Sequence, residues 1–268
     1  MIETETIVPV NSEADIELLA AAGAVVAETL DLVEDAIAPG ITTQELDKLA
    51  EDFILSKGAK PAFKGYRVGH LEFPFSLCIS IDEEVVHGMP SNRMLKEGQI
   101  VSIDCGAELD GFFGDSARTV GVGTIPAEKQ RLLDVTREAL MLGIEAAVEG
   151  DKIYSISKAV QTHVEKNGFS VVRELVGHGI GRNLHEEPPV PNFVPGLLHR
   201  SRYPNLKLRN GMALAIEPMV NMGLFQVHTA SDGWTVYTAD AKPSAHFEHT
   251  VVINGTTPRI LTLSRRNG

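Results

Sequence analysis

Apolar side chains recur every three to four residues over four segments of the chain, and this period predicts four helices. Ser12 is a favourable N-cap for the first helix, and a glycine follows the end of each one. Short connections join the helices into two pairs, which we expect to pack as units. The expected helices cover residues 12–37, 42–58, 127–148 and 153–167.

The glycines that end these helices indicate an internal repeat. Gly58 follows Gly40 at the same interval at which Gly168 follows Gly150. The shift that places Gly40 on Gly150 also places the apolar face of the second helix on that of the fourth. Capping glycines are common, so a chance agreement is the alternative. The expected halves are about residues 12–122 and 123–264.

After each helix pair the apolar period changes to that of strands, with polar or glycine-rich turns between the runs. Strands that follow helix pairs are typical of an α+β protein, here a mostly antiparallel sheet covered by helix pairs. The long polar stretch at residues 188–211 is expected to line a site. The expected strands are 77–81, 84–87, 100–107 and 112–120, then 171–176, 212–220, 226–230, 234–238, 246–253 and 258–263.

Composition narrows the classes of function. The 268 residues are 43% hydrophobic, which supplies a globular core, and the net charge of −12 argues against nucleic-acid binding. Two cysteines, Cys78 and Cys105, lie in apolar runs and form no disulfide framework. The first residues lack a signal-peptide pattern, and no apolar run is long enough to span a membrane. We therefore expect a cytoplasmic protein without membrane or nucleic-acid partners.

Two aspartates are predicted to converge on one face of a hairpin. Asp110-Gly111 lies between two strand-like runs and is a strong turn signal, which places Gly106 opposite Asp115. Asp104, two positions before Gly106, then projects from the same face as Asp115. Such a pair repels and is poorly solvated unless a cation neutralises it. Two solvated aspartates, or an ion pair with Arg118, are the alternatives that the hairpin alone leaves open.

Further candidate metal ligands lie downstream. Glu217 ends one apolar run and Glu248 precedes another, and neither run contains the Lys or Arg that most often pairs with a buried glutamate. His178 lies among glycines, and His185 follows seven positions later. Either histidine alone is more often a turn residue. Together with the carboxylates they form a mixed nitrogen and oxygen set that suits Mn, Fe, Co or Zn rather than calcium.

Other chemistries fit the sequence less well. The string GHGIG lacks the Lys-Ser/Thr of a phosphate loop and the strand–turn–helix context of a dinucleotide site. Neither cysteine shows a sign of activation, and no GxSxG serine elbow occurs. A metal site remains the favoured interpretation.

At these residues the chain resembles the type I methionine aminopeptidases, members of the pita-bread family that includes prolidases, aminopeptidase P and creatinase. The resemblance begins near residue 12 and covers nearly the whole chain. It implies one catalytic domain, residues 1–268, with the pita-bread fold and two pseudo-symmetric halves. The matching strings are CISIDEEVVHGMP at 78–90, VSIDCGAELDGFFGDSA at 101–117, VGHGIGRNLHEEP at 176–188, AIEPMVNMG at 215–223, DGWTVYT at 232–238 and SAHFEHTVVI at 244–253.

The resemblance also implies a function and a set of metal ligands. The function is removal of the initiator methionine from the N-terminal segments of nascent polypeptides, at the ribosome, by a metal-activated hydroxide that attacks the first peptide bond. Two divalent ions, Co, Mn, Fe or Zn, are implied, with Asp115 and Glu248 bridging them. The implied ligands are Asp104, Asp115, His178, Glu217 and Glu248.

Roles for the remaining residues follow from the same resemblance. His87 and His185 face the substrate as catalytic residues, His87 near the scissile nitrogen and His185 near the carbonyl oxygen, while Glu217 relays a proton. The methionine pocket is implied at the positions of Tyr66, Phe73, Cys78 and Trp234.

The chain departs from the family pattern at two places. GYRVGHLEFP is four residues longer between Tyr66 and Phe73 than the family's string, which bears on the shape of the pocket. His70 lies within this insertion and is expected to be exposed to solvent. Asp82 stands where the family usually has asparagine.

Two rival functions remain. An X-Pro aminopeptidase or prolidase would use the same metals but typically carries a further N-terminal domain. A non-catalytic pita-bread binding protein usually loses ligands and gains basic patches, whereas this chain keeps all five ligands and a net charge of −12. Nothing in the sequence demands an oligomer, so a monomer is expected.

Overall fold

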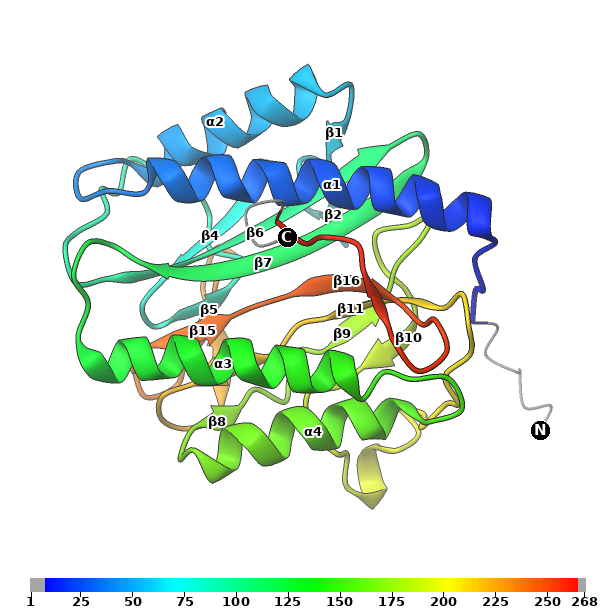
Figure 1. Ribbon diagram of the computed structural model, residues 1–268. Helices are drawn as coiled ribbons and strands as arrows, with labels where there is room; N and C mark the ends of the chain where they lie inside the picture. The colour runs from blue at the N-terminus through cyan, green and yellow to red at the C-terminus, as the bar shows by residue number, and fades with distance from the viewer. Residues whose placement is uncertain (1–7, 265–268) are drawn as a thin grey trace.

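Two helix pairs enclose a layer of antiparallel strands in the computed structural model, which describes residues 8–264 (Figure 1). One pair, α1 (Glu13–Ala36) and α2 (Thr43–Ser56), covers the strands of the first half. The other, α3 (Ala127–Glu145) and α4 (Ile153–Lys166), lies on the opposite side of the molecule. The expected α+β arrangement is confirmed.

Local sequence sets where the helices begin. Ser12 caps α1 through the backbone N–H of Asp15, and Thr42 caps α2 through that of Glu45, each in a reciprocal capping box. Helices α2 and α4 have the same length. Both the first and the last residue of α4 lie 110 positions after those of α2, which is the shift from Gly40 to Gly150. Helix α3 ends at residue 145, slightly earlier than expected, where an i→i−3 bond tightens the last turn.

The first half is built around one long hairpin. Strand β6 (Ile100–Leu109) pairs with β7 (Phe112–Gly121) in the predicted register, in which Gly106 lies opposite Asp115. Both turn residues, Asp110 and Gly111, have positive φ angles of 52° and 77°, which Asp-Gly turns favour. Strand β4 (Leu77–Ile81) and the short β1 (Lys60–Pro61) pair with β6.

Shorter strands make up the rest of the layer, and all of their pairings are antiparallel. In one sheet the order is β10, β9, β11, β16, β17. The strands are β2 (Arg67–Val68), β3 (Leu71–Glu72), β5 (Glu84–Val86), β8 (Ser170–Val171), β9 (Gly177–Gly179), β10 (Glu186–Val190), β11 (Ala213–Ile216), β12 (Met219–Asn221), β13 (Val227–Thr229), β14 (Val236–Thr238), β15 (Ser244–His246), β16 (His249–Val252) and β17 (Arg259–Ile260); a 3-10 turn covers Leu197–His199.

The expected strands 212–220 and 246–253 are each broken in two, so that part of the prediction was wrong. The first break lies at Glu217-Pro218, between β11 and β12, where proline has no N–H to donate to a ladder. The second lies at residues 247–248, between β15 and β16, beside the first: the N–H of Phe247 donates to the carbonyl oxygen of Pro218. The two breaks place Glu217 and Glu248 off the regular strand surface.

A second error concerns the run 171–176, which is strand only at its first residue, as the end of β8. The glycine-rich segment that follows forms β9 instead. Glycine has low strand propensity, but here it is required by crowding: a Cβ on Gly177 would lie 2.3 Å from the carbonyl oxygen of Ala215, and one on Gly179 2.2 Å from that of Glu187. The neighbouring strands β10 and β11 can approach β9 only because no side chain intervenes.

Hydrogen bonds join the two halves along β7 and the β15–β16 segment. The Thr250 hydroxyl donates to the carbonyl oxygen of Asp115 and accepts from its N–H, and the Ser116 hydroxyl donates to the carbonyl oxygen of Glu248. The N–H of Glu248 donates to the carbonyl oxygen of Ala117. We call this contact the seam, and it brings Asp115 of one half next to Glu248 of the other.

Each helix pair buries an apolar core against its own strands. Leu30, Leu46, Ile54, Ile79 and Ile103 are among the buried residues of the first core, and Leu132, Ile156, Val160, Leu214 and Val220 among those of the second. Within residues 8–264 no helix has both the length and the apolar character that crossing a membrane requires.

Helix α1 meets β7 where two glycines face each other. A Cβ built on Gly114 would lie 2.7 Å from the backbone nitrogen of Gly23 and 2.8 Å from its Cα, too close for either backbone to remain in place. We expect Gly114→Ala to reduce the free energy of unfolding by about 1–3 kcal/mol, the usual cost of an overpacked contact. Denaturant unfolding measures this change. Gly196→Ala is the matched control, because nothing lies within 4 Å of its Cβ position and its φ is −63°; equal losses in the two variants would contradict the close packing.

Candidate metal centre and active site

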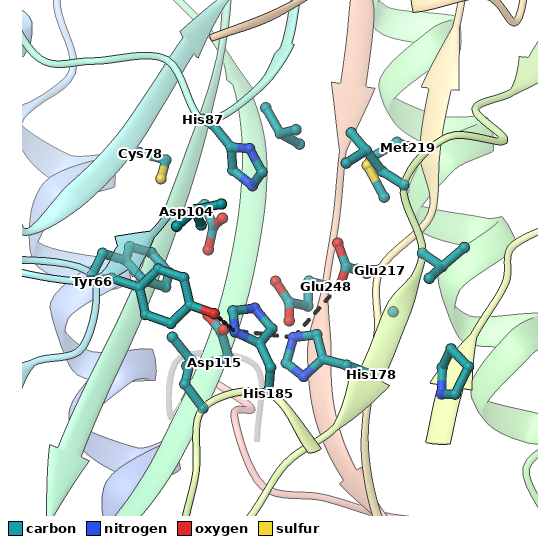
Figure 2. Close-up of a pocket in the computed structure, with 18 of the residues that line it drawn as sticks. Tyr66, Cys78, His87, Asp104, Asp115, His178, His185, Glu217, Met219 and Glu248 are labelled. Carbon is teal, nitrogen blue, oxygen red and sulfur yellow. Dashed lines mark hydrogen bonds and ion pairs between the residues drawn. The ribbon is translucent and has the colours of Figure 1, made fainter. Parts of the chain in front are cut away.

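Every site residue that the sequence predicted lies around one pocket of about 380 Å³, which opens between the two halves (Figure 2). Asp104 and Asp115 face Glu217, Glu248 and His178 across the pocket, and His87, His185 and aromatic side chains complete the lining. The predicted residues in the lining are Tyr66, Phe73, Cys78, His87, Asp104, Asp115, His178, His185, Glu217, Trp234 and Glu248.

Asp104 and Asp115 project into the pocket from neighbouring strands, β6 and β7. Their register partners are Ala117 and Gly106, so the two aspartates are diagonal neighbours on one face, as the hairpin predicted. Both side chains point toward the same space in Figure 2. Arg118, the alternative partner, instead binds Asp31 at 2.6 Å and Glu34 at 3.2 Å.

Glu217 and Glu248 reach the pocket from the second half at the two strand breaks. Glu248 is buried, and its backbone is held to β7 at the seam. The carbonyl oxygen of Glu217 accepts a hydrogen bond from Asn192. The carboxylates of both halves therefore meet at the seam. Hydrogen bonds hold the backbone segments that carry them in place.

His178 completes the group from β9. Its Nδ1 lies 2.8 Å from the carbonyl oxygen of Gly179, and since a carbonyl only accepts, Nδ1 carries the proton and donates. The Nε2 lone pair is then free, 4.0 Å from Asp115 Oδ2 and 3.8 Å from Glu217 Oε1. This is the tautomer of a metal-binding histidine whose other nitrogen is fixed by the backbone.

Burial and mutual repulsion control the charge of these carboxyl groups. Burial raises the pKa of Asp104 to about 7 and that of Glu217 to about 8. Burial, and then the charges of neighbouring carboxylates, also raise the pKa of Asp115 and of Glu248 well above the usual range. No Lys or Arg is among the described residues that line the pocket.

The residues present fit a divalent cation. Asp104 Oδ1, Asp115 Oδ1 and Glu248 Oε1 are buried oxygens without a hydrogen-bond partner among residues 8–264, and such atoms need a compensating charge or donor. One ligand atom from each of Asp115, His178 and Glu248 lies within 4.8 Å of the others. Carboxylate oxygens with one imidazole form the mixed donor set of transition metals and zinc.

His87 and His185 line the same pocket as the carboxylates and His178. His87 has a positive φ of 59°, a conformation that costs energy in a residue with a Cβ and that often marks a functional site. Burial lowers its pKa to about 4, so the imidazole is neutral at pH 7. His185 is exposed at the pocket, where Nδ1 lies 2.9 Å from the Tyr66 hydroxyl, and its ring centroid is 4.4 Å from that of His178.

Aromatic rings and a thiol form the apolar wall. Phe73 and Trp234 contact edge to face, with ring centroids 5.3 Å apart. Asp232 fixes the turn before the tryptophan by accepting from the Trp234 N–H at 2.7 Å. Cys78 lies opposite Asp104 in the β4–β6 ladder, and burial followed by the Asp104 charge raises the pKa of its thiol, which remains protonated.

The sequence reasoning missed a histidine beside the carboxylates, as well as apolar lining residues such as Val68 and Met219. His246 is buried beside the carboxylates, with Nε2 3.5 Å from Glu217 Oε2 and 4.0 Å from Glu248 Oε2. The available signal was its spacing, since His246 precedes Glu248 by two positions in an apolar run, the interval at which a strand returns a side chain to the same face.

The structure shows where the two departures from the family pattern lie, namely Asp82 and the insertion between Tyr66 and Phe73. Asp82 has a positive φ of 53° in the turn between β4 and β5, a conformation that aspartate and asparagine both tolerate, and it binds Lys129. The inserted residues form the β2–β3 hairpin, and His70 is exposed in its turn, as expected.

The raised pKa values predict how the metal-free protein responds to pH. Because the folded-state pKa values of Asp104 and Glu217 lie above the unfolded values of about 4, the stability that their neutral forms provide is complete below about pH 4 and is lost as pH rises through about 7 to 8. The buried histidines have lowered pKa values, so their unfolded forms lose their protons around pH 6.5, and only above about pH 7.5 are they neutral in both states and without effect on the pH dependence.

Between about pH 7.5 and 8.5, chelator-treated protein should therefore lose stability in urea unfolding, and Glu217→Gln should lose less because one titrating group is gone. An excess of a divalent cation should remove the pH dependence by stabilising the ionised carboxylates. A Glu217→Gln variant that loses as much stability as the unchanged chain over this window would contradict the assignment of the raised pKa.

Comparison with known proteins finds relatives that match nearly the whole chain. A methionine aminopeptidase from Clostridium perfringens is 53% identical over 254 residues, which are 94% of this chain and 98% of the relative. The crystal structure of a methionine aminopeptidase from Rickettsia prowazekii superposes with a TM-score of 0.90 at 40% identity, over 96% of this chain and 100% of the other. A prolidase from Pyrococcus furiosus, at 22% identity and a TM-score of 0.75, shares the fold over 96% of this chain and 66% of its own length.

These likenesses confirm the expected pita-bread fold. Residues 17–255 match the profile of metallopeptidase family M24 over most of the chain. The chain belongs to metallopeptidase family M24.

Proposed function

We propose that this protein removes the N-terminal methionine from polypeptides and that two divalent cations serve the reaction. The observation that carries the proposal is that one pocket contains both a group of carboxylates that could hold a divalent cation and an apolar, largely aromatic wall. Relatives named methionine aminopeptidase, 42% to 53% identical over nearly their full length, support the same function.

The cations would be held by Asp104, Asp115, His178, Glu217 and Glu248. Asp115 and Glu248, whose backbones meet at the seam, are the two residues that would serve both cations, Co, Mn, Fe or Zn. Bound divalent cations supply Lewis acidity and lower the pKa of water toward 7. The donor set and the unpaired buried oxygens fit this group of ligands.

Glu217 is the carboxylate that we assign to proton transfer. Its side chain is 14% exposed, compared with 5% for Asp115 and 3% for Glu248, so it can reach both water and substrate. Its raised pKa, before the influence of any cation, lies near the pH at which a proton acceptor works well.

The neutral imidazoles of His87 and His185 would bind the scissile peptide group. A neutral imidazole can donate one hydrogen bond, His87 toward the amide nitrogen side and His185 toward the carbonyl oxygen, where negative charge develops. The Tyr66 hydroxyl, 2.9 Å from His185 Nδ1, orients the second imidazole. These donors are already in place before substrate binds.

The same pocket explains why only the first residue would be removed. A free α-amine is attracted by the carboxylates, whereas an internal peptide bond offers no positive charge at this position. The unbranched methionine side chain suits the wall of Tyr66, Phe73, Cys78 and Trp234, because a thioether contacts aromatic rings favourably.

We place this activity in a single catalytic domain, since all the site residues lie within residues 8–264 and both halves contribute to them. Newly made polypeptides are the substrates that present an initiator methionine, which points to nascent chains near the ribosome in the cytoplasm. Action as a monomer agrees with a pocket formed within one chain.

The decisive assay is methionine release from a Met-Ala-Ser peptide. We expect Asp104→Asn to reduce it by more than about 100-fold, because neutralising a ligand weakens cation binding more than outer-shell changes do. A chelator should abolish release, and Co, Mn, Fe or Zn should restore it. Asp110→Asn is the matched control: it makes the same change at the exposed turn of the same hairpin, where asparagine tolerates the positive φ.

An Ala-Pro peptide assayed beside it tests the rival function. Cleavage of the Ala-Pro peptide alone would refute the assignment to methionine and favour an X-Pro peptidase. Binding of peptides without any cleavage, with all cations supplied, would favour a non-catalytic protein.

A further inference from the structure

The inserted residues after Tyr66 form a hairpin, and one face of this hairpin lines the pocket. Arg67 pairs with Glu72 and Val68 with Leu71 in the antiparallel β2–β3 register. Because side chains alternate along a strand, Tyr66 and Val68 share one face, and both line the pocket. Arg67 and Glu72 point to the other face, where they form an ion pair at 2.6 Å.

Contacts at its base and its side fix the hairpin to the active site. The N–H of Phe73 donates to the carbonyl oxygen of Tyr66 at 2.9 Å, which continues the ladder into the aromatic wall. Leu71 packs on the turn that precedes Trp234, since a Cβ on Gly233 would lie 2.5 Å from Leu71 Cδ1. The hairpin therefore has a defined position relative to the wall.

Val68 lies at the open end of the pocket. It is 55% exposed and yet lines the cavity, as does the exposed His185 beside Tyr66. The carboxylates and the buried Cys78 lie deeper. A polypeptide with its first residue at the carboxylates can therefore pass this exposed apolar side chain where it leaves the pocket.

The period of an extended chain indicates which substrate residue meets Val68. Side chains two positions apart on one strand face are separated by about 6.6 Å, and an extended substrate beside β2 has the same period. If the first side chain contacts Tyr66, the third lies beside Val68. This step rests on the proposed removal of an N-terminal residue.

We propose that the β2–β3 hairpin is a specificity element that binds the third residue of the substrate through Val68. The chain then favours polypeptides with an apolar third residue over those with a small polar one. Val68 would contact the third residue equally in the bound ground state and in the transition state. The preference therefore appears in KM rather than in kcat.

Three peptides, Met-Ala-Leu-Ser, Met-Ala-Ser-Ser and the dipeptide Met-Ala, test the proposal with the metal-loaded full chain. We expect a value of kcat/KM about tenfold higher for the leucine peptide than for the serine peptide, a usual size for an apolar side-chain contact. Val68→Ser should reduce this ratio to about one through KM, and Val68→Leu should keep it. Leu55→Ser is the matched control, because Leu55 is 52% exposed on α2 and lies outside the pocket lining.

The outcomes separate the specificity proposal from the proposed function. An unchanged leucine-to-serine ratio in Val68→Ser, or a ratio near one in the original chain, would overturn the role of the hairpin while methionine release stands. Failure of the original chain to release methionine from any of the three peptides would overturn the proposed function itself. If Val68→Ser disrupts the hairpin, two other variants decide the matter. Val68→Leu should keep the leucine-to-serine ratio of kcat/KM, and replacement of residues 67–72 by a short glycine linker should abolish it.

Discussion

Electrostatic repulsion among four carboxylates that are wholly or largely removed from solvent is the constraint on which the rest of this structure depends. Asp104, Asp115, Glu217 and Glu248 face one another, and no basic side chain lines the described pocket to balance them. Their raised pKa values reflect the free energy that ionisation would require there. A fold that keeps these groups together is stable near neutral pH when cations replace the protons, so cation binding and folding are thermodynamically linked.

The backbone holds the carboxylates in place by two different means. The first half uses a regular hairpin, in which register alone fixes Asp104 and Asp115 on one face. The second half uses interruptions of its strands, where Glu217 and Glu248 leave the ladder and turn toward the seam. The hydrogen bonds of Thr250 and Ser116 then connect the two arrangements. Neither half contains the complete set of proposed ligands.

Sequence reasoning was most successful where geometry is local. The Asp110-Gly111 turn determines its own register, so the position of Asp115 opposite Gly106 could be derived by counting. The helix pairs followed from period and capping, and the shift that relates α2 to α4 agrees with the structure. The family resemblance added the grouping of residues from distant segments, which no period in the sequence reveals.

The failures came where contacts between distant segments override local preference. Glycines at 177 and 179 have low strand propensity, but the approach of β10 and β11 makes them the only residues that fit in β9. The break after Glu217 had a local signal in Pro218 that the apolar pattern hid, whereas the break before Glu248 follows from the contact of Phe247 with Pro218 on a distant segment. His246 was overlooked because one of its two carboxylate neighbours, Glu217, lies on a separate segment of the chain.

The seam has a consequence for the order in which this protein is made and folded. Its hydrogen bonds join residues 131 to 135 positions apart, and contacts of such long range form slowly and only after both partners are available. Since synthesis proceeds from the N-terminus, the hairpin with Asp104 and Asp115 can fold while Glu248 and Thr250 are still absent. The pocket can therefore be completed only after the segment with Glu248 and Thr250 has left the ribosome, however early the hairpin folds.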